Sequence, residues 1–209
     1  GDDSITQFYA AKIGDKYYKS LTDAYAEANE SENTEIVLLK DYTIDKFIEI
    51  KKPITLNLGG KVLTSRSSGF DVYKNFTIKN GTLNTATWGV WTQNKDVAFT
   101  LESDATINAD CDTELTNAAG VIAVQGAVVN IKGTVTAKHN FAVSGNGTDG
   151  WGDVVINIAD KANVSTTEDA PALYFPNTTA LNISGGTIIG GTGVYVKSGQ
   201  VNISGGNIT

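Results

Sequence analysis

A short phrase of Asn, a branched aliphatic residue, small polar residues and glycine recurs along this chain. Its two clearest copies are Asn-Ile-Ser-Gly-Gly-Thr-Ile at residues 182–188 and Asn-Ile-Ser-Gly-Gly-Asn-Ile at residues 202–208. Looser copies lie within residues 55–60, 77–83, 100–102, 130–135 and 157–160. Self-similarity with a period of about 20 to 50 residues is typical of a solenoid, in which each unit buries its apolar face against its neighbours.

The central aliphatic residue of each copy is an anchor for comparing the units. The anchors recur every 20 to 30 residues, at Leu58, Ile78, Leu101, Ile131, Ile158, Ile183 and Ile203. Such units are too short for a βαβ crossover, which needs about 30 residues with a helix between the strands. Polar and apolar residues alternate around the anchors, as they do in strands. We therefore expect seven coils whose anchors lie over one another, with loops of different length between them.

A second apolar segment follows each anchor at a shorter distance. Examples are residues 70–73, 89–92 and 172–175. Strands that all return in one direction describe a parallel β-helix, and parallel strands prefer right-handed connections. The tight hexapeptide repeat that is usual in left-handed β-helices is absent. The predicted fold class is all-β, a right-handed single-stranded parallel β-helix.

The first part of the chain differs from the repeats. Ser20 is a candidate helix N-cap, with an acidic residue, Asp23, three places on. Apolar residues then follow at helical spacing, at Leu21, Ala24, Tyr25 and Ala28. This pattern predicts a short amphipathic helix from about Ser20 to Asn29, which would cover the open end of the solenoid as a capping α-helix.

These boundaries give one structural domain in two parts. Residues 1–35 form the N-terminal segment with its capping helix, and residues 36–209 form the β-helix, cut within a repeat phrase at its C-terminus. An uncovered coil exposes apolar side chains and strand edges. We therefore expect either that the native protein continues or that a partner covers the last coil, including end-to-end self-association of this chain.

One stretch resembles a known class of protein. The opening segment of pectate-lyase-like right-handed β-helix modules in bacterial surface proteins is resembled by residues 11–14, 18–21, 23–24, 28, 34–41 and 54–63. The resemblance covers roughly residues 10 to 65, and the remainder only in its style of repeat. It implies an exported bacterial protein, extracellular or at the cell surface and often built from several modules, most of which have no assigned activity.

The composition and charge of the chain exclude some classes of binding partner. The formal charge of −7 over 209 residues argues against a nucleic acid or an anionic membrane surface, because either would require a basic face. No apolar stretch is long enough to span a bilayer, so no membrane insertion is expected. The single cysteine, Cys111, cannot form an internal disulfide. We expect a half-buried thiol there, with an intermolecular bridge as the alternative.

Acidic residues suggest one metal site. Asp110, Asp112 and Glu114 alternate, so their carboxylates would project to one side of an extended segment and could hold calcium through oxygen ligands. The default expectation is a solvated acidic loop without any cofactor, and the calcium site is the alternative.

Complete catalytic signatures are missing from the sequence. Residues 145–150 match the dinucleotide pattern G-x-G-x-x-G, but a strand pattern follows where that motif requires a helix. His139 and Arg66 are the only residues of their types, and neither has a recognisable catalytic partner. Sugar hydrolysis usually needs two carboxylates about 5 to 9.5 Å apart, and Asp71 cannot be paired with another acid from the sequence.

Aromatic residues give the constructive hint to function. If the neighbouring aliphatic residues point into the coil, four aromatic side chains point outward on one face: Tyr73, Trp91, Tyr174 and Tyr195. Rings at the spacing of successive coils could bind the apolar faces of sugars, or they could simply steady the coil. The main hypothesis is a non-catalytic, adhesive or structural surface module that binds polysaccharide or host-cell glycan. The alternative is an atypical polysaccharide lyase or glycoside hydrolase.

Overall fold

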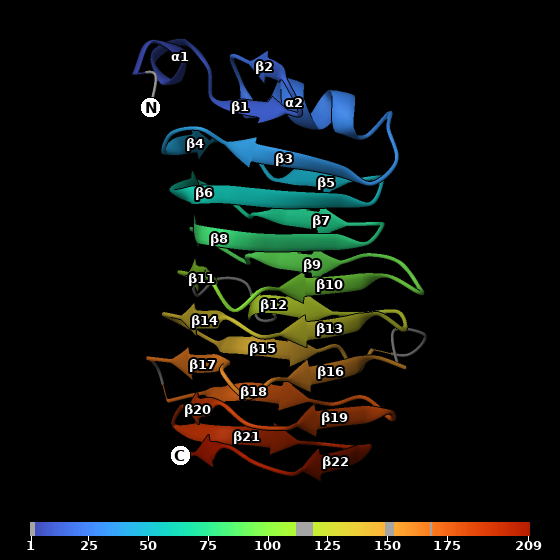
Figure 1. Ribbon diagram of the computed structural model, residues 1–209. Helices are drawn as coiled ribbons and strands as arrows, with labels where there is room; N and C mark the ends of the chain where they lie inside the picture. Colours follow the sequence, from blue (N-terminus) through green and yellow to red (C-terminus); the bar gives the residue numbers. More distant parts are fainter. Residues whose placement is uncertain (1–2, 112–118, 149–152, 168) are drawn as a thin grey trace.

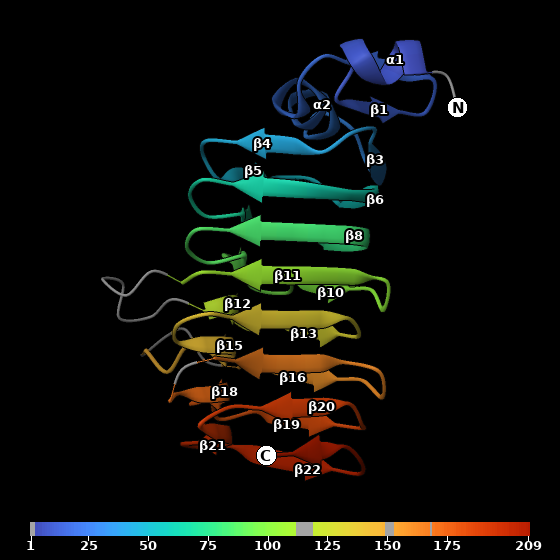
Figure 2. The same cartoon turned by 90° about the vertical axis from the view of Figure 1, so that its left-hand side faces the viewer.

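The chain is wound into a column of stacked coils (Figures 1 and 2). The computed structural model describes residues 3–111, 119–148, 153–167 and 169–209. The coils wind in a right-handed sense, and parallel strands of successive coils pair along the column. The predicted fold class is therefore confirmed, including the short N-terminal helix.

Each coil contributes to two parallel sheets. In the larger sheet, here sheet A, each coil contributes to two arms that meet at a bend. The long strands β6 and β8 continue from one arm to the other. Its first arm contains β3 (Thr34–Leu38), β6 (Ile54–Ser65), β8 (Phe76–Thr85), β10 (Ala98–Leu101), β13 (Val128–Ile131), β16 (Val155–Ile158), β19 (Ala180–Ile183) and β22 (Gln200–Ile203). Its second arm contains the later halves of β6 and β8 together with β4 (Tyr42–Ile44), β11 (Ala105–Ala109), β14 (Thr134–Ala137), β17 (Asn163–Thr166), β20 (Thr187–Ile189) and β23 (Asn207–Ile208).

The smaller sheet, here sheet B, closes each coil on the opposite side. Its seven strands are β5 (Ile48–Ile50), β7 (Phe70–Val72), β9 (Val90–Thr92), β12 (Ala119–Ala123), β15 (Phe141–Gly145), β18 (Pro171–Phe175) and β21 (Thr192–Val196). Most of these strands are only three to five residues long, so sheet B is a narrow strip that runs along the column axis.

The anchors lie over one another almost as the repeat predicts. Ile78 pairs with Leu101, and the line continues in register through the later anchors to Ile203. The expectation for Leu58 is wrong, because Leu56 is the residue that pairs with Ile78. The register between β6 and β8 shifts after Asn57, so Leu58 is buried at the bend of sheet A instead.

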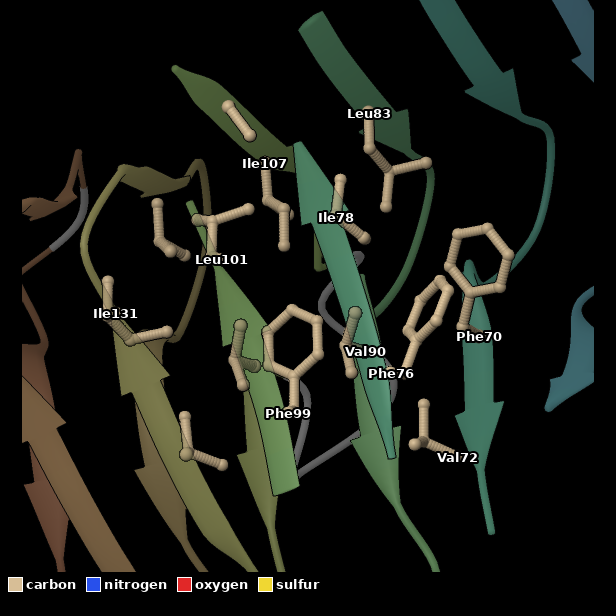
Figure 3. Packing of buried hydrophobic residues seen from close by; sticks show 14 of the residues in the cluster. Phe70, Val72, Phe76, Ile78, Leu83, Val90, Phe99, Leu101, Ile107 and Ile131 are labelled. Carbon is tan, nitrogen blue, oxygen red and sulfur yellow. The ribbon is translucent and has the colours of Figure 1, made fainter. Parts of the chain in front are cut away.

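The interior is a continuous column of apolar side chains. Near the N-terminal end it contains a line of aromatic rings (Figure 3): Phe70 and Phe76 have centroids 4.8 Å apart, and Phe76 and Phe99 have centroids 6.0 Å apart. Tyr25 of the capping helix extends this line, 5.8 Å from Phe70. The helix is therefore packed into the core of the β-helix.

The N-terminal segment covers one end of the column. It contains α1 (Asp3–Phe8), which the sequence did not predict, the antiparallel pair β1 (Ala11–Ile13) and β2 (Lys16–Tyr18), and α2 (Leu21–Ala28). The Ser20 side chain caps α2 by accepting a hydrogen bond from the Asp23 amide. At the other end of α2, the Asn29 side chain donates to the Glu49 carbonyl and accepts from the Lys51 amide. The predicted capping helix is thus capped at its first turn and hydrogen-bonded to the first coil at its last residue.

The asparagine and the second glycine of the repeated phrase each have a structural role. Along the outside of sheet A, Asn157 donates from its side-chain amide to the Asn130 side chain, Asn182 donates to Asn157, and Asn202 donates to Asn182. The second glycine, Gly186, has a φ of +83°, and a Cβ there would lie 2.5 Å from the Ala162 carbonyl oxygen. The phrase therefore supplies one rung of an external amide ladder and one tight turn.

The structure also bears on the burial of the single cysteine and on membrane insertion. Cys111 is completely buried, not half-buried, and burial raises the pKa of its thiol to about 12. Within the described ranges, no helix has the length and apolar character needed to cross a bilayer.

The aromatic line in the core predicts a large local contribution to stability. Phe76→Ala should reduce the free energy of unfolding by about 3 to 5 kcal/mol, because it removes a fully buried ring and leaves a cavity between Phe70 and Phe99. Phe8→Ala is the control, since the Phe8 side chain is 61% exposed and its loss should change stability by no more than about 0.5 kcal/mol. Equilibrium denaturation measures both. Equal effects of the two substitutions would contradict a continuous packed core.

Candidate functional site

The outer face of sheet B carries an uninterrupted line of side chains, one from each coil. Strand registers place these residues next to one another in the order Glu49, Asp71, Trp91, Ile122, Ser144, Tyr174 and Tyr195. We call this line the outer row. Because alternate side chains of a strand point to opposite faces, these positions all project away from the core. The outer row is acidic at its N-terminal end and aromatic at its C-terminal end.

Three of the four predicted aromatic residues belong to the outer row, and Tyr73 does not. Asp71 is the partner of Trp91, so Tyr73 lies two positions further along the chain, at the corner after β7. There it lines a separate hollow of about 530 Å³ together with Lys74 and Lys95. The expectation of one shared line is wrong for Tyr73 because Val72 pairs with Thr92 rather than with Val90.

The C-terminal aromatics form a stack. The Phe141 and Tyr174 rings have centroids 4.8 Å apart with planes at 23°, and the Tyr174 and Tyr195 rings have centroids 5.5 Å apart with planes at 13°. Stacked rings cover one another's faces, so this arrangement differs from the separate platforms expected from the sequence. It presents ring edges along its side and an outermost ring, Tyr195, that is 49% exposed.

A hollow of about 210 Å³ lies beside this stack. Ile122, Phe141 and Tyr174 give it apolar walls, and its polar lining comes from Ser144, Asn146, Thr148 and Lys197. Apolar walls with a few polar groups are typical of small binding sites. Lys197 is the one charged side chain among the described residues that line it.

The rim loop of this hollow is held in place by hydrogen bonds. The buried Asn177 side chain donates to the Asn146 carbonyl over 2.8 Å, and the Thr148 amide donates to the Asn146 side chain over 2.9 Å. Gly145 is required at this point, since a Cβ there would lie 1.8 Å from the Asn177 side-chain oxygen. The next described element after this loop is the strand β16, which confirms the strand pattern expected after the glycine-rich motif.

A second aromatic group lies nearer the N-terminal end. The indoles of Trp88 and Trp91 meet edge to face, with centroids 5.1 Å apart and planes at 87°. Both pack with Phe141 over Ile122, which is only 2% exposed although it points outward. This indole corner makes a small apolar cluster outside the main core.

Asp71 lies beside this indole corner with its carboxyl half-buried. Burial raises the pKa of Asp71, while the Gln93 and Trp88 side chains lower it and the nearby Glu49 charge raises it further. Glu49 occupies the neighbouring position on β5 and forms an ion pair with Lys51, with 2.6 Å between nitrogen and oxygen. This pair of acids was not predicted from the sequence. The matching triplets Ile48-Glu49-Ile50 and Phe70-Asp71-Val72 were the available signal.

The structure tests the predicted calcium site only in part. Asp110 is described, whereas Asp112 and Glu114 lie outside the described residues. The Asp110 carboxylate is 3.2 Å from the Lys138 amine and 3.7 Å from the His139 ring nitrogen. Among the described residues, no group of three His, Cys, Asp or Glu side chains could hold a metal ion. Calcium binding by this segment stays a prediction.

Arg66, the single arginine of the sequence, forms a surface ion pair with Asp45, with 2.8 Å between nitrogen and oxygen. Both side chains are more than two-thirds exposed, so the pair contributes little to stability. Arg66 lies on the corner after the second arm of sheet A and is not part of the outer row.

Comparisons of this chain with protein-family models, with curated proteins and with solved structures find no match. The parallel β-helix is observed directly, whereas the likeness to pectate-lyase-like bacterial modules stays a proposal based on the opening segment.

The raised pKa of Asp71 predicts that its ionised carboxylate lowers the free energy of unfolding at neutral pH. A raised folded-state pKa stabilises the protein below the unfolded-state pKa of about 3.9, and this contribution is lost as pH rises through the folded-state pKa. Asp71→Asn should therefore become more stable than the original protein as pH rises above about 4, by less than about 1 kcal/mol because the group is half exposed.

Denaturation between acidic and neutral pH measures this difference. Asp45→Asn provides the matched control, because Asp45 is exposed and, among the described residues, forms an ion pair with Arg66 alone. Lower stability of Asp71→Asn than of the original protein at neutral pH would show that burial does not dominate the environment of Asp71.

Proposed function

We propose that this protein is a non-catalytic β-helix module of an exported bacterial protein, and that it binds polysaccharide along the outer face of sheet B. The observation that carries the proposal is the difference between the two outer faces. The outer face of sheet B gathers aromatic rings around a hollow with polar lining, whereas asparagines on the outer face of sheet A hydrogen-bond to one another.

A saccharide suits the chemistry of this hollow. Sugar rings have apolar C–H faces and hydroxyl edges, so they need an apolar wall next to hydrogen-bonding groups. Tyr174 and Phe141 provide the wall, and Ser144, Asn146 and Thr148 provide donors and acceptors. The Asn177 hydrogen bond holds the rim before a ligand arrives, which reduces the entropy lost on binding.

An atypical carbohydrate-active enzyme is the second candidate. The observation in its favour is the pairing of Glu49 with Asp71 on adjacent strands, since two neighbouring carboxyl groups are the usual machinery of glycoside hydrolysis. The Lys51 ion pair occupies Glu49, which favours the binding interpretation. Release of reducing ends from a polysaccharide panel, lost in Asp71→Asn, would instead favour the enzyme.

The binding proposal predicts a specific dependence on the aromatic stack. Titration calorimetry against a panel of neutral and acidic polysaccharides should identify a ligand whose affinity falls at least tenfold in Tyr174→Ala, which corresponds to about 1.4 kcal/mol. Tyr195→Ala should weaken the same ligand less, because Tyr195 forms the end of the stack and does not line the hollow.

Tyr17→Ala is the matched control. Tyr17 is also a partly exposed tyrosine beside another aromatic ring, but it lies in the N-terminal segment, so its loss should leave binding unchanged. Binding that survives Tyr174→Ala in a folded protein, or a panel without any ligand, would refute the proposal.

A further inference from the structure

We propose that the N-terminal half of the outer row is a second subsite of the same binding face, at which Asp71 and the indole corner of Trp88 and Trp91 recognise an uncharged sugar residue through its hydroxyl groups. This inference rests on the proposed function and adds the direction in which the polysaccharide lies and the chemical class of one of its residues.

The two subsites belong to one continuous surface. Asp71, Trp91, Ile122, Ser144 and Tyr174 are register neighbours on five successive strands of sheet B. Four steps of about 4.8 Å separate Asp71 from Tyr174, so a ligand that reaches both must extend about 19 Å along the column axis. This length requires an oligosaccharide.

Asp71 and Trp88 are complementary to a hydroxyl group. The Asp71 Oδ1 atom and the Trp88 Nε1 atom are both withdrawn from solvent, and neither makes a hydrogen bond of normal geometry within the described residues. The Trp88 and Gln93 side chains nevertheless lie close enough to Asp71 to lower its pKa. A sugar hydroxyl both donates and accepts, so it could donate to the carboxylate and accept from the indole N–H.

Withholding these two groups from water has a cost that a ligand would remove. A donor or acceptor that is withdrawn from water without a partner lowers stability, which is a reason to look for a partner that is absent in the free protein. Both residues are only half-buried, so their side chains form part of the surface. The edge-to-face indoles beside them offer an apolar corner for the sugar ring.

Charge selects the class of sugar at this subsite. At this end of the outer row Lys51 offsets the charge of Glu49, whereas the Asp71 carboxylate one coil away has no basic partner among the causes of its raised pKa, so it would repel a uronate or sulfated residue in contact with it. The opposite end has Lys197 at its hollow. The residue bound beside Asp71 is therefore an uncharged, hydroxyl-rich one, whatever substituents the polysaccharide carries near Tyr174.

The test uses oligosaccharides of increasing length. Cello-, xylo-, manno- and galacto-oligosaccharides, each from disaccharide to octasaccharide, and the matching fragments of any polysaccharide that the panel identifies, are titrated against the original protein, Asp71→Asn, Trp88→Leu and Tyr174→Ala. In the original protein, affinity should rise with length until the chain spans both subsites. In Asp71→Asn and Trp88→Leu, the affinity of the longest oligomers should fall at least tenfold, while the short oligomers bound at Tyr174 keep theirs.

The variants separate this inference from the proposed function. Asp71→Asn is expected to be at least as stable as the original protein at neutral pH, so lost binding cannot be attributed to unfolding. If Tyr174→Ala abolishes binding while Asp71→Asn and Trp88→Leu bind long oligomers normally, the second subsite is refuted and the proposed function stands. If Asp71→Asn weakens short and long oligomers equally, the axial direction is refuted. If the original protein binds no saccharide, both proposals fail.

Discussion

Parallel, in-register pairing between successive coils is the constraint on which the rest of this structure depends. Each strand pairs in register with the equivalent strand of the next coil. The closest cross-strand neighbour of a residue is therefore the residue at the same position one coil away. Residues at one position of successive coils therefore form a line along the column. Inward positions repeat as an apolar core, and outward positions repeat as lines of side chains whose chemistry decides what each face can do.

Sequence reasoning succeeds where this repetition is strict. The line from Ile78 to Ile203 follows from the phrase alone, because each copy keeps the same pattern around its anchor. It fails at Leu58, where an irregular pairing after Asn57 moves the register by two residues. It also fails at Tyr73, because β7 and β9 have three residues each and variable loops on both sides, too little pattern to fix a register. The pairing of Glu49 with Asp71 was missed for the same reason.

The outer faces of sheets A and B differ in how their polar side chains are arranged. On sheet A, a side-chain amide can donate to the next coil and accept from the previous one, so asparagines satisfy each other over several coils. Sheet B has no comparable ladder of like residues in its outer row, which passes from carboxylates through an indole to phenols. The first arrangement stabilises the column through hydrogen bonds between coils, whereas the outer row of sheet B contains no such ladder of identical amides.

The shape of sheet B explains why such a molecule would lie along the axis. Across the sheet, a strand of three to five residues spans only about 10 to 17 Å before the chain turns at a corner. Along the axis, the outer row continues over seven strands without interruption. The stack of Phe141, Tyr174 and Tyr195 has the same direction, since each ring comes from a successive strand. A ligand that crosses the sheet would meet one side chain of the outer row, whereas a ligand parallel to the axis meets one from every coil that it passes.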